Sequence, residues 1–162
     1  MKYALRHARI RGLIFAAAIV AVDQYSKKFF AETLQSHDAA MAILPFFNIQ
    51  LVLNRGISFG MLAGTMSWLP LFLTLGTSLI VLLLALWLAR AQERFVILGL
   101  SVIIGGALGN ITDRIRYGFV IDFLDFHLGS HHWPAFNIAD IAVFIGVVIL
   151  VLMSIVRPNT DL

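Results

Sequence analysis

The longest stretch of the chain without a charged residue constrains its fold most. No Lys, Arg, Asp or Glu occurs between Arg55 and Arg90. At 1.5 Å per residue, a helix over residues 68–89 is long enough to cross a hydrocarbon core of about 30 Å. The whole chain is 60% hydrophobic and only 13% charged, whereas a soluble domain carries about 25% charged residues. The sequence therefore predicts an integral membrane protein and excludes an ordinary soluble or disordered one.

Other apolar runs complete a predicted set of four transmembrane helices within one domain. These helices are expected over about residues 10–30, 68–89, 95–113 and 136–156. The first helix has the weakest signal, because Asp23, Lys27 and Lys28 follow its apolar part. Its basic beginning is similar to that of a secretory signal peptide, but residues 23–27 (DQYSK), which follow the apolar part, fit a cleavage site poorly. We therefore expect an uncleaved helix.

Three groups of basic residues flank the predicted helices on the same side. They are Lys2, Arg6, Arg9 and Arg11 before the first helix, Arg90 and Arg94 between the second and third, and Arg157 after the fourth. By the positive-inside rule this side is the cytoplasm, so both termini are expected there. The rule also explains the net charge of +3 without nucleic acid as a partner.

The two outward segments are then residues 31–67 and 114–135. Residues 46–54 have the β-branched and aromatic content of a strand, and Asn54-Arg55-Gly56 is typical of a turn. A hairpin alone is only marginally stable, so it needs a surface to pack on. We therefore expect residues 31–67 to form a small β-structured cap on the outer membrane surface.

Two groups of residues favour a structural role. Asp23 and Lys27 are four residues apart, with the acid on the N-terminal side, which is the favourable order for an ion pair on a helix. Gly105 and Gly109 form a small face on the third helix, of the kind that lets transmembrane backbones approach closely. We expect pairing from the first group and helix packing from the second.

Polar residues gather where the third helix reaches the outer side of the membrane. They are Asn110, Asp113, Arg114 and Arg116, followed by Asp122 and Asp125. Farther on, Asn137 can cap the fourth helix, with Asp140 in its first turn. Helix capping explains Asp140, and a solvated loop explains Asp122, without any catalytic role.

A functional interpretation follows if Asp122 and Asp140 meet at one membrane depth. Repulsion between two such carboxylates keeps one protonated while the other is ionised. One can then act as a base on water while the other acts as an acid on a leaving nitrogen, as in aspartic proteases. Such a pair needs no metal and no cofactor.

Two other site chemistries receive weaker support. Asp125, His127, His131 and His132 offer metal-ligand types, but the H-E-x-x-H signature is absent. A Ser-Lys dyad could use Ser26 or Ser58 with Lys27, although no spacing signature marks it. Without cysteine, the chain has no thiolate nucleophile.

Five sequence blocks carry a resemblance to a known family. They are Val22-Asp23-Gln24 with Lys27, residues 54–60 (NRGISFG), 105–114 (GGALGNITDR), 120–123 (VIDF) and 136–140 (FNIAD). The chain resembles the lipoprotein signal peptidases, or bacterial signal peptidase II, over nearly its whole length. The resemblance implies an inner-membrane aspartic endopeptidase. Such an enzyme removes the signal peptide of a diacylglyceryl-modified prolipoprotein, cutting just before the lipid-modified cysteine.

The resemblance also implies roles for individual residues. Asp122 and Asp140 match the catalytic pair, and no metal or cofactor is implied. Asn54 and Gly56 match the outer cap, Asn110, Arg114 and Asn137 match polar positions that line the site, and Asp23 matches a supporting position. Ile57 and Ser58 stand where many members have two alanines, which leaves detailed substrate preference open. A single chain is expected to be sufficient for activity.

Two other classes of function stay open from the residues alone. In a proton-coupled transporter, Asp122 and Asp140 would be relay sites within a helical bundle. In a non-enzymatic assembly partner, the glycine face of the third helix would dock another helix. The residues also leave open which aspartate would be the base.

Overall fold

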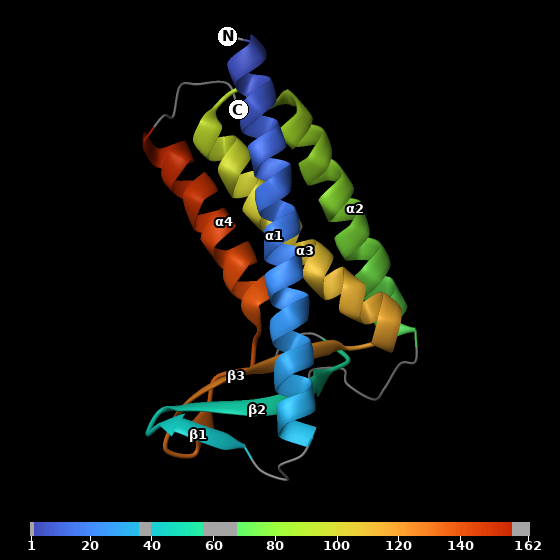
Figure 1. Ribbon diagram of the computed structural model, residues 1–162, viewed down its shortest axis with the longest axis vertical. Coiled ribbons are helices and arrows are strands. Elements are labelled where there is room, and N and C mark those ends of the chain that lie inside the picture. Colours follow the sequence, from blue (N-terminus) through green and yellow to red (C-terminus); the bar gives the residue numbers. More distant parts are fainter. Residues whose placement is uncertain (1, 36–39, 57–67, 157–162) are drawn as a thin grey trace.

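The computed structural model describes residues 2–35, 40–56 and 68–156. Its helices are α1 (Lys2–Gln35), α2 (Leu69–Arg90), α3 (Arg94–Tyr117) and α4 (Ile138–Val156). Its strands are β1 (Met41–Leu44), β2 (Phe47–Asn54), β3 (Val120–Leu128) and β4 (His131–His132). The four helices form a bundle, and the strands lie across one end of it (Figure 1).

Three of the helices, α2, α3 and α4, are long and apolar enough to cross a membrane. The first helix, α1, is not one of the three, because Asp23, Lys27 and Lys28 interrupt its apolar part. The protein is thus a mostly helical membrane protein with a small antiparallel sheet. A membrane crossing by α1 stays a prediction.

Helix α3 is the centre of the bundle. In its most apolar window 78% of the residues are buried inside the protein, against 6% for α2 and 17% for α4. The glycines of α3 make this central position possible, because a Cβ at Gly105 would lie 2.9 Å from the Ala16 carbonyl oxygen of α1. At Gly106 an added Cβ would meet the Ala139 carbonyl oxygen of α4. The expected packing role of this glycine face is confirmed.

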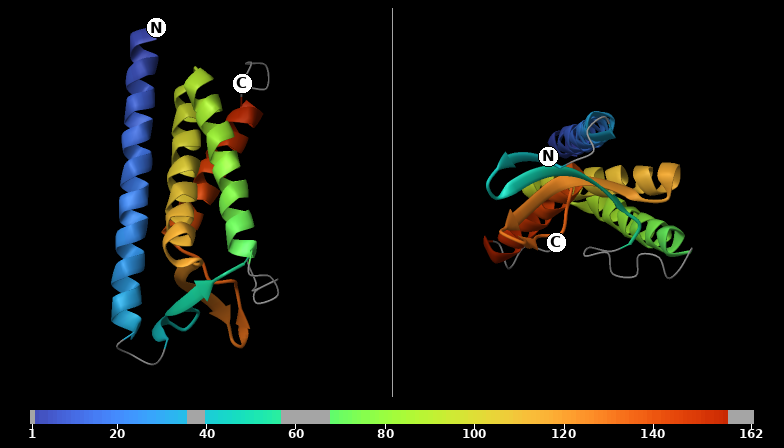
Figure 2. Two further views of the ribbon diagram at one scale, coloured as in Figure 1. Left: turned by 90° about the vertical axis from the view of Figure 1, so that its right-hand side faces the viewer. Right: turned by 90° about the horizontal axis from the view of Figure 1, so that it is seen from below.

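The sheet has the order β1-β2-β3-β4, and neighbouring strands are antiparallel. Strand β2 agrees to within one residue with the strand predicted over residues 46–54. The predicted turn follows it, and there the Gly56 N–H donates to Asn54 Oδ1 at 3.0 Å. Of the rest of the predicted cap, residues 31–35 continue α1 instead, and residues 36–39 and 57–67 lie outside the described residues. Figure 2 shows the strands crossing beneath the ends of α2, α3 and α4, at the level of the last part of α1.

The sheet draws two of its strands from residues 120–132, a part of the chain for which the sequence predicts only an outward segment. Strand β3 pairs along β2, with Val52 opposite Asp122 and Asn54 opposite Val120. Because aspartate is depleted in strands, Asp122 and Asp125 conceal the strand signal of the apolar residues around them. This pairing fixes where Asp122 lies.

Candidate active site

Asp122 and Asp140 line one groove of about 630 Å³, although they belong to different elements. Asp122 is the third residue of β3, and Asp140 lies in the first turn of α4. The wall of the groove also includes Asn54, Gly56, Asn110 and Arg114. The sheet and the beginning of α4 thus bring both carboxylates to the same depth of the molecule.

Asp140 is oriented by the start of its own helix. The Asn137 Oδ1 accepts from the Asp140 N–H at 3.0 Å, and the Asp140 Oδ2 accepts from the Asn137 N–H at 3.1 Å. These two reciprocal bonds form a capping box, which satisfies backbone donors that a helix start leaves unpaired. The predicted cap is confirmed, and it holds the carboxylate rather than competing with a role in the groove.

Asp122 is held by two side-chain amides from other elements. Asn54 Nδ2 donates to its Oδ2 at 3.0 Å, and Asn137 Nδ2 donates to its Oδ1 at 2.7 Å. Asp122 is 2% exposed, so the solvated-loop interpretation of this residue is wrong. Pairing of β2 with β3 buries it, since Asn54 ends β2 beside Val120.

Asn137 connects the two carboxylates. Its side-chain nitrogen donates to Asp122, and its backbone nitrogen donates to Asp140. Asn137 is fully buried. Its bond to Asp122 is buried as well, whereas its bond to Asp140 is partly exposed. Neither carboxylate can then shift without breaking a bond to the same residue.

The environment of Asp122 changes its proton affinity. Burial raises its pKa to about 7, and the nearby charge of Asp140 raises it as well. The hydrogen bonds from Asn54 and Asn137 and the charge of Lys27 act in the opposite direction. A carboxylic acid with this pKa is present in both protonation states near neutral pH, as acid–base catalysis requires.

A buried polar network lies behind Asp140. The Lys27 ammonium contacts Asp23 Oδ2 at 2.8 Å, Asp113 Oδ2 at 2.8 Å and Asn110 Oδ1 at 2.9 Å. An ammonium has three donors and no acceptor, so these partners occupy it fully. The Asn110 oxygen must face Lys27, and its Nδ2 therefore donates to Asp140 Oδ1 at 2.8 Å. Lys27 thereby fixes the orientation of the amide that contacts Asp140.

The expected ion pair of Asp23 and Lys27 is confirmed, and the structure adds a contact that spacing within α1 could not predict. Asp23 Oδ1 accepts from the Ala139 N–H at 2.9 Å, in the first turn of α4. Asp23 does not line the groove. It joins α1 to α4, and through Lys27 and Asn110 it reaches Asp140.

The remaining predicted site residues lie on the groove wall. Arg114 is partly buried there, and its charge interacts with those of Asp140, Asp122 and Asp113. Gly56 is buried at the turn after β2. Asp113 and Gln24 are further members of the polar network that the sequence interpretation did not assign, and Gln24 Nε2 donates to Asp113 Oδ1 at 2.7 Å. The sequence signal for Asp113 was the dense polar run over residues 110–116, and that for Gln24 was its place in the Val22-Asp23-Gln24 block.

The three candidate metal-ligating histidines, His127, His131 and His132, are not part of the groove wall. His132 Nδ1 pairs with Asp125 at 2.9 Å, and its ring stacks on that of His127 with centroids 5.0 Å apart. Within the part of the chain that the structure describes, no group of three or more potential ligands is placed to hold a metal ion. His132 and Asp125 therefore form a pair at the far part of β3.

A Ser-Lys dyad is not formed by Ser26. Its hydroxyl donates to the Asp23 carbonyl oxygen at 2.8 Å, while Lys27 is occupied by the partners described above. Ser58 lies outside the described residues, as does Ile57. Of the site chemistries considered, the paired carboxylates are therefore favoured, because both Asp122 and Asp140 line one groove and accept hydrogen bonds from neighbouring residues.

Sequence comparison identifies close relatives over most of the chain. The profile of the family described as Signal peptidase (SPase) II matches residues 15–156. The lipoprotein signal peptidase of Desulforapulum autotrophicum is 42% identical over 158 residues, covering 96% of this chain and 98% of that protein. That of Syntrophotalea carbinolica is 43% identical over 143 residues, covering 86% of this chain and 88% of that protein.

Structural comparison gives a consistent result. A bacterial membrane enzyme solved at 2.3 Å resolution superposes with a TM-score of 0.79 and 27% sequence identity, covering 94% of both chains. A second bacterial membrane enzyme, solved at 1.9 Å, superposes with a TM-score of 0.76 and 29% identity. The bundle and the sheet together are thus an arrangement that solved membrane enzymes share.

Proposed function

Because the chain belongs to the signal peptidase II family, we propose that it is an aspartic endopeptidase acting on diacylglyceryl-modified prolipoproteins. Family members are proteases that cleave signal peptides from prolipoproteins. The enzyme cuts its prolipoprotein substrate just before the lipid-modified cysteine of that substrate. The observation that carries the proposal is the presence of Asp122 and Asp140 on one groove, both bonded to Asn137.

The environments of the two carboxylates support different roles. Asp140 accepts a backbone N–H and lies at a helix N-terminus, where the helix dipole favours negative charge. Asp122 lies buried on a strand with its pKa raised to about 7. We therefore assign Asp140 as the base and Asp122 as the acid.

The reaction then needs only a water molecule and these two groups. Asp140 takes a proton from water, whose oxygen bonds to the scissile carbonyl carbon and forms a tetrahedral intermediate. Asp122 gives its proton to the peptide nitrogen, and the C–N bond breaks. The products are a new carboxyl end on the signal peptide and a free amine on the cysteine. Arg114 lies near enough to both carboxylates to support the charge that develops on the intermediate.

The other residues on the groove wall support entry from the bilayer. Leu73 of α2 and Val143, Phe144 and Val147 of α4 give the groove an apolar side. A signal helix can lie along this side while its diacylglyceryl chains stay in lipid, which avoids the cost of exposing them to water. Only the scissile peptide must reach the polar groups.

The proposed topology has four membrane crossings with both termini in the cytoplasm and the groove near the outer leaflet. A crossing by α1 is supported by its buried charges, because Asp23 and Lys27 neutralise each other inside the protein. One chain supplies every residue of the groove wall described here, which supports activity as a monomer.

Cleavage by the purified protein in detergent tests the function. We expect a diacylglyceryl-modified prolipoprotein to be converted, with mass spectrometry locating the cut before the modified cysteine. The same prolipoprotein without the lipid serves as the matched substrate and is expected to be cut much more slowly. A well-folded protein that converts neither substrate, or that cuts elsewhere, would contradict the proposal.

A further inference from the structure

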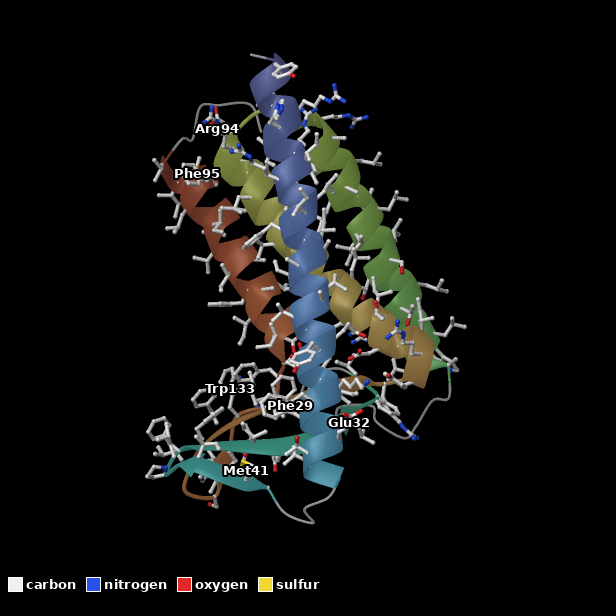
Figure 3. The ribbon with its side chains drawn as sticks, viewed as in Figure 1. Phe29, Glu32, Met41, Arg94, Phe95 and Trp133 are labelled. Carbon is white, nitrogen blue, oxygen red and sulfur yellow. The ribbon has the colours of Figure 1, made fainter. Side chains whose placement is uncertain are left out.

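A second cavity, of about 700 Å³, lies on the other face of β3 from the groove. Its wall includes Phe119 and Ile121, whereas the groove wall includes Val120 and Asp122. Since successive side chains of a strand point to opposite faces, the sheet separates the two spaces. Trp133 of the groove and Glu32 of the cavity appear on opposite sides of α1 in Figure 3. The cavity is therefore a separate, open site, bounded by α1, the end of α3 and the sheet.

The cavity lies at the level where the apolar spans end. Tyr117 is the last residue of α3, and both Tyr117 and Tyr25 of α1 are exposed at the cavity wall. Exposed tyrosines at the end of a membrane span are typical of the bilayer interface. Apolar side chains of β2, Leu51 and Leu53, line the cavity as well. The wall thus offers both polar and apolar surface at headgroup depth.

Two cations of this wall are available to a ligand. Arg116 has five N–H donors and, within the described part of the chain, donates one long bond, to Gln24 Oε1 at 3.3 Å. The Lys28 side chain is 75% exposed and lies 3.8 Å from Glu32, a weak pair. By contrast, Lys27 and Asp113 at the cavity floor are buried and bonded to each other.

We propose that this cavity binds the headgroup of a membrane phospholipid through its phosphate diester. Arg116 and Lys28 contact the phosphate from α3 and α1, respectively. The tyrosines flank the glycerol region, and the first methylenes of the chains cover the leucines of β2. A phosphate diester carries one negative charge and acceptor oxygens only, which complements two cations that reach the same space from two helices.

Substitution of Glu32 tests whether lipid binding can be strengthened as well as weakened. Its carboxylate competes with the phosphate for Lys28, so Glu32→Gln is expected to strengthen binding, whereas Arg116→Gln weakens it. A merely structural effect of these substitutions would not change binding in opposite directions. Lys27 is left unchanged, because it also contacts Asn110 of the groove.

The experiment titrates the full-length protein in detergent with a short-chain phosphatidylglycerol and follows bound lipid by native mass spectrometry. We expect Arg116→Gln and Lys28→Gln each to weaken binding by about tenfold. Glu32→Gln should tighten it. The control variant Arg90→Gln, at the end of α2 away from the cavity, should bind as the unmodified protein does.

Two further ligands test whether the cavity recognises the phosphate and the acyl chains of the lipid together. The matching diacylglycerol lacks the phosphate and is expected to bind much more weakly, while glycerophosphoglycerol keeps the phosphate diester but lacks the chains and is expected not to compete. Equal binding of diacylglycerol would overturn the phosphate contact. Equal binding of glycerophosphoglycerol would overturn the lipid assignment. Phosphatidylglycerol binding that the Arg116, Lys28 and Glu32 variants all leave unchanged would overturn the site.

Discussion

Asn137 controls the geometry of the candidate site, because its two nitrogens donate to different carboxylates. The backbone N–H fixes Asp140 within the capping box, and the side-chain amide fixes Asp122 across the groove. The spacing of Asn137 and Asp140 was sufficient to predict the cap. The bond to Asp122 depends on where β3 lies, and a local pattern carries no such information.

The raised pKa of Asp122 leads to a prediction for the pH dependence of cleavage. An acid must be protonated to act, so kcat/KM should fall as the pH rises through about 7. Because the hydrogen bond from Asn54 lowers the pKa of Asp122, Asn54→Ala should move this fall to higher pH. Initial rates from pH 5 to 9 check the shift, and a fall at the same pH in both proteins would contradict the role of Asp122 as the acid.

The buried ammonium of Lys27 leads to a prediction for stability. Lys27→Met leaves Asp23 and Asp113 buried without their cation, and removing one partner of such a group costs about 3–5 kcal/mol. Lys28→Met, one residue along on the exposed side of α1, is the matched control and should leave stability nearly unchanged. Thermal unfolding in detergent measures both, and similar midpoints for the two variants would show that the network contributes little.

Among the elements, α3 depends most on close backbone approach. A Cβ at Gly106 would meet the α4 backbone at Ala139, one residue before Asp140, and would lie 3.0 Å from Val143 Cγ2. The small-residue spacing predicted this packing. It could not show that the glycine face lies against the part of α4 that carries the carboxylate.

We expect Gly106→Ala to push α4 away from α3. The overpacking should cost about 1–3 kcal/mol and should lower the cleavage rate, because Asp140 moves with the helix. Gly76→Ala in α2 is the matched control, since an added Cβ there meets nothing within 4 Å. Unfolding temperature and rate are measured for both variants. Equal behaviour of the two would contradict the packing account.

Strand β3 marks the limit of sequence-based prediction at the level of elements. The helices and β2 follow from apolar runs and β-branched residues, which are local signals. Strand β3 carries Asp122 and Asp125 within an apolar sequence. It is stabilised by pairing with β2, in which each residue lies about 70 positions earlier in the chain than its partner; Val52, for instance, is opposite Asp122. Because this stabilisation is non-local, only the structure shows that the sheet supplies one of the two carboxylates.

At the scale of the whole molecule, the proposed orientation rests on the distribution of basic residues. The absence of cysteine from the sequence allows single cysteines to be introduced without background labelling. Ser130→Cys, in the exposed loop between β3 and β4, should react with a membrane-impermeant maleimide added to spheroplasts, whose inner membrane is intact. Gln92→Cys, between α2 and α3, should react only after the membrane is permeabilised. The opposite labelling pattern would reverse the orientation.

The measurement that tests the central claim most directly compares prolipoprotein cleavage by the unmodified protein, Asp122→Asn, Asp140→Asn and Asp125→Asn. Asp125 is the matched control, because it is a buried aspartate on the same strand as Asp122 but lies outside the groove. All four proteins are first shown to be folded by their thermal unfolding. We expect cleavage to be abolished in the first two variants and retained in Asp125→Asn. Cleavage near the unmodified rate by either Asp122→Asn or Asp140→Asn would contradict the account of a two-aspartate peptidase.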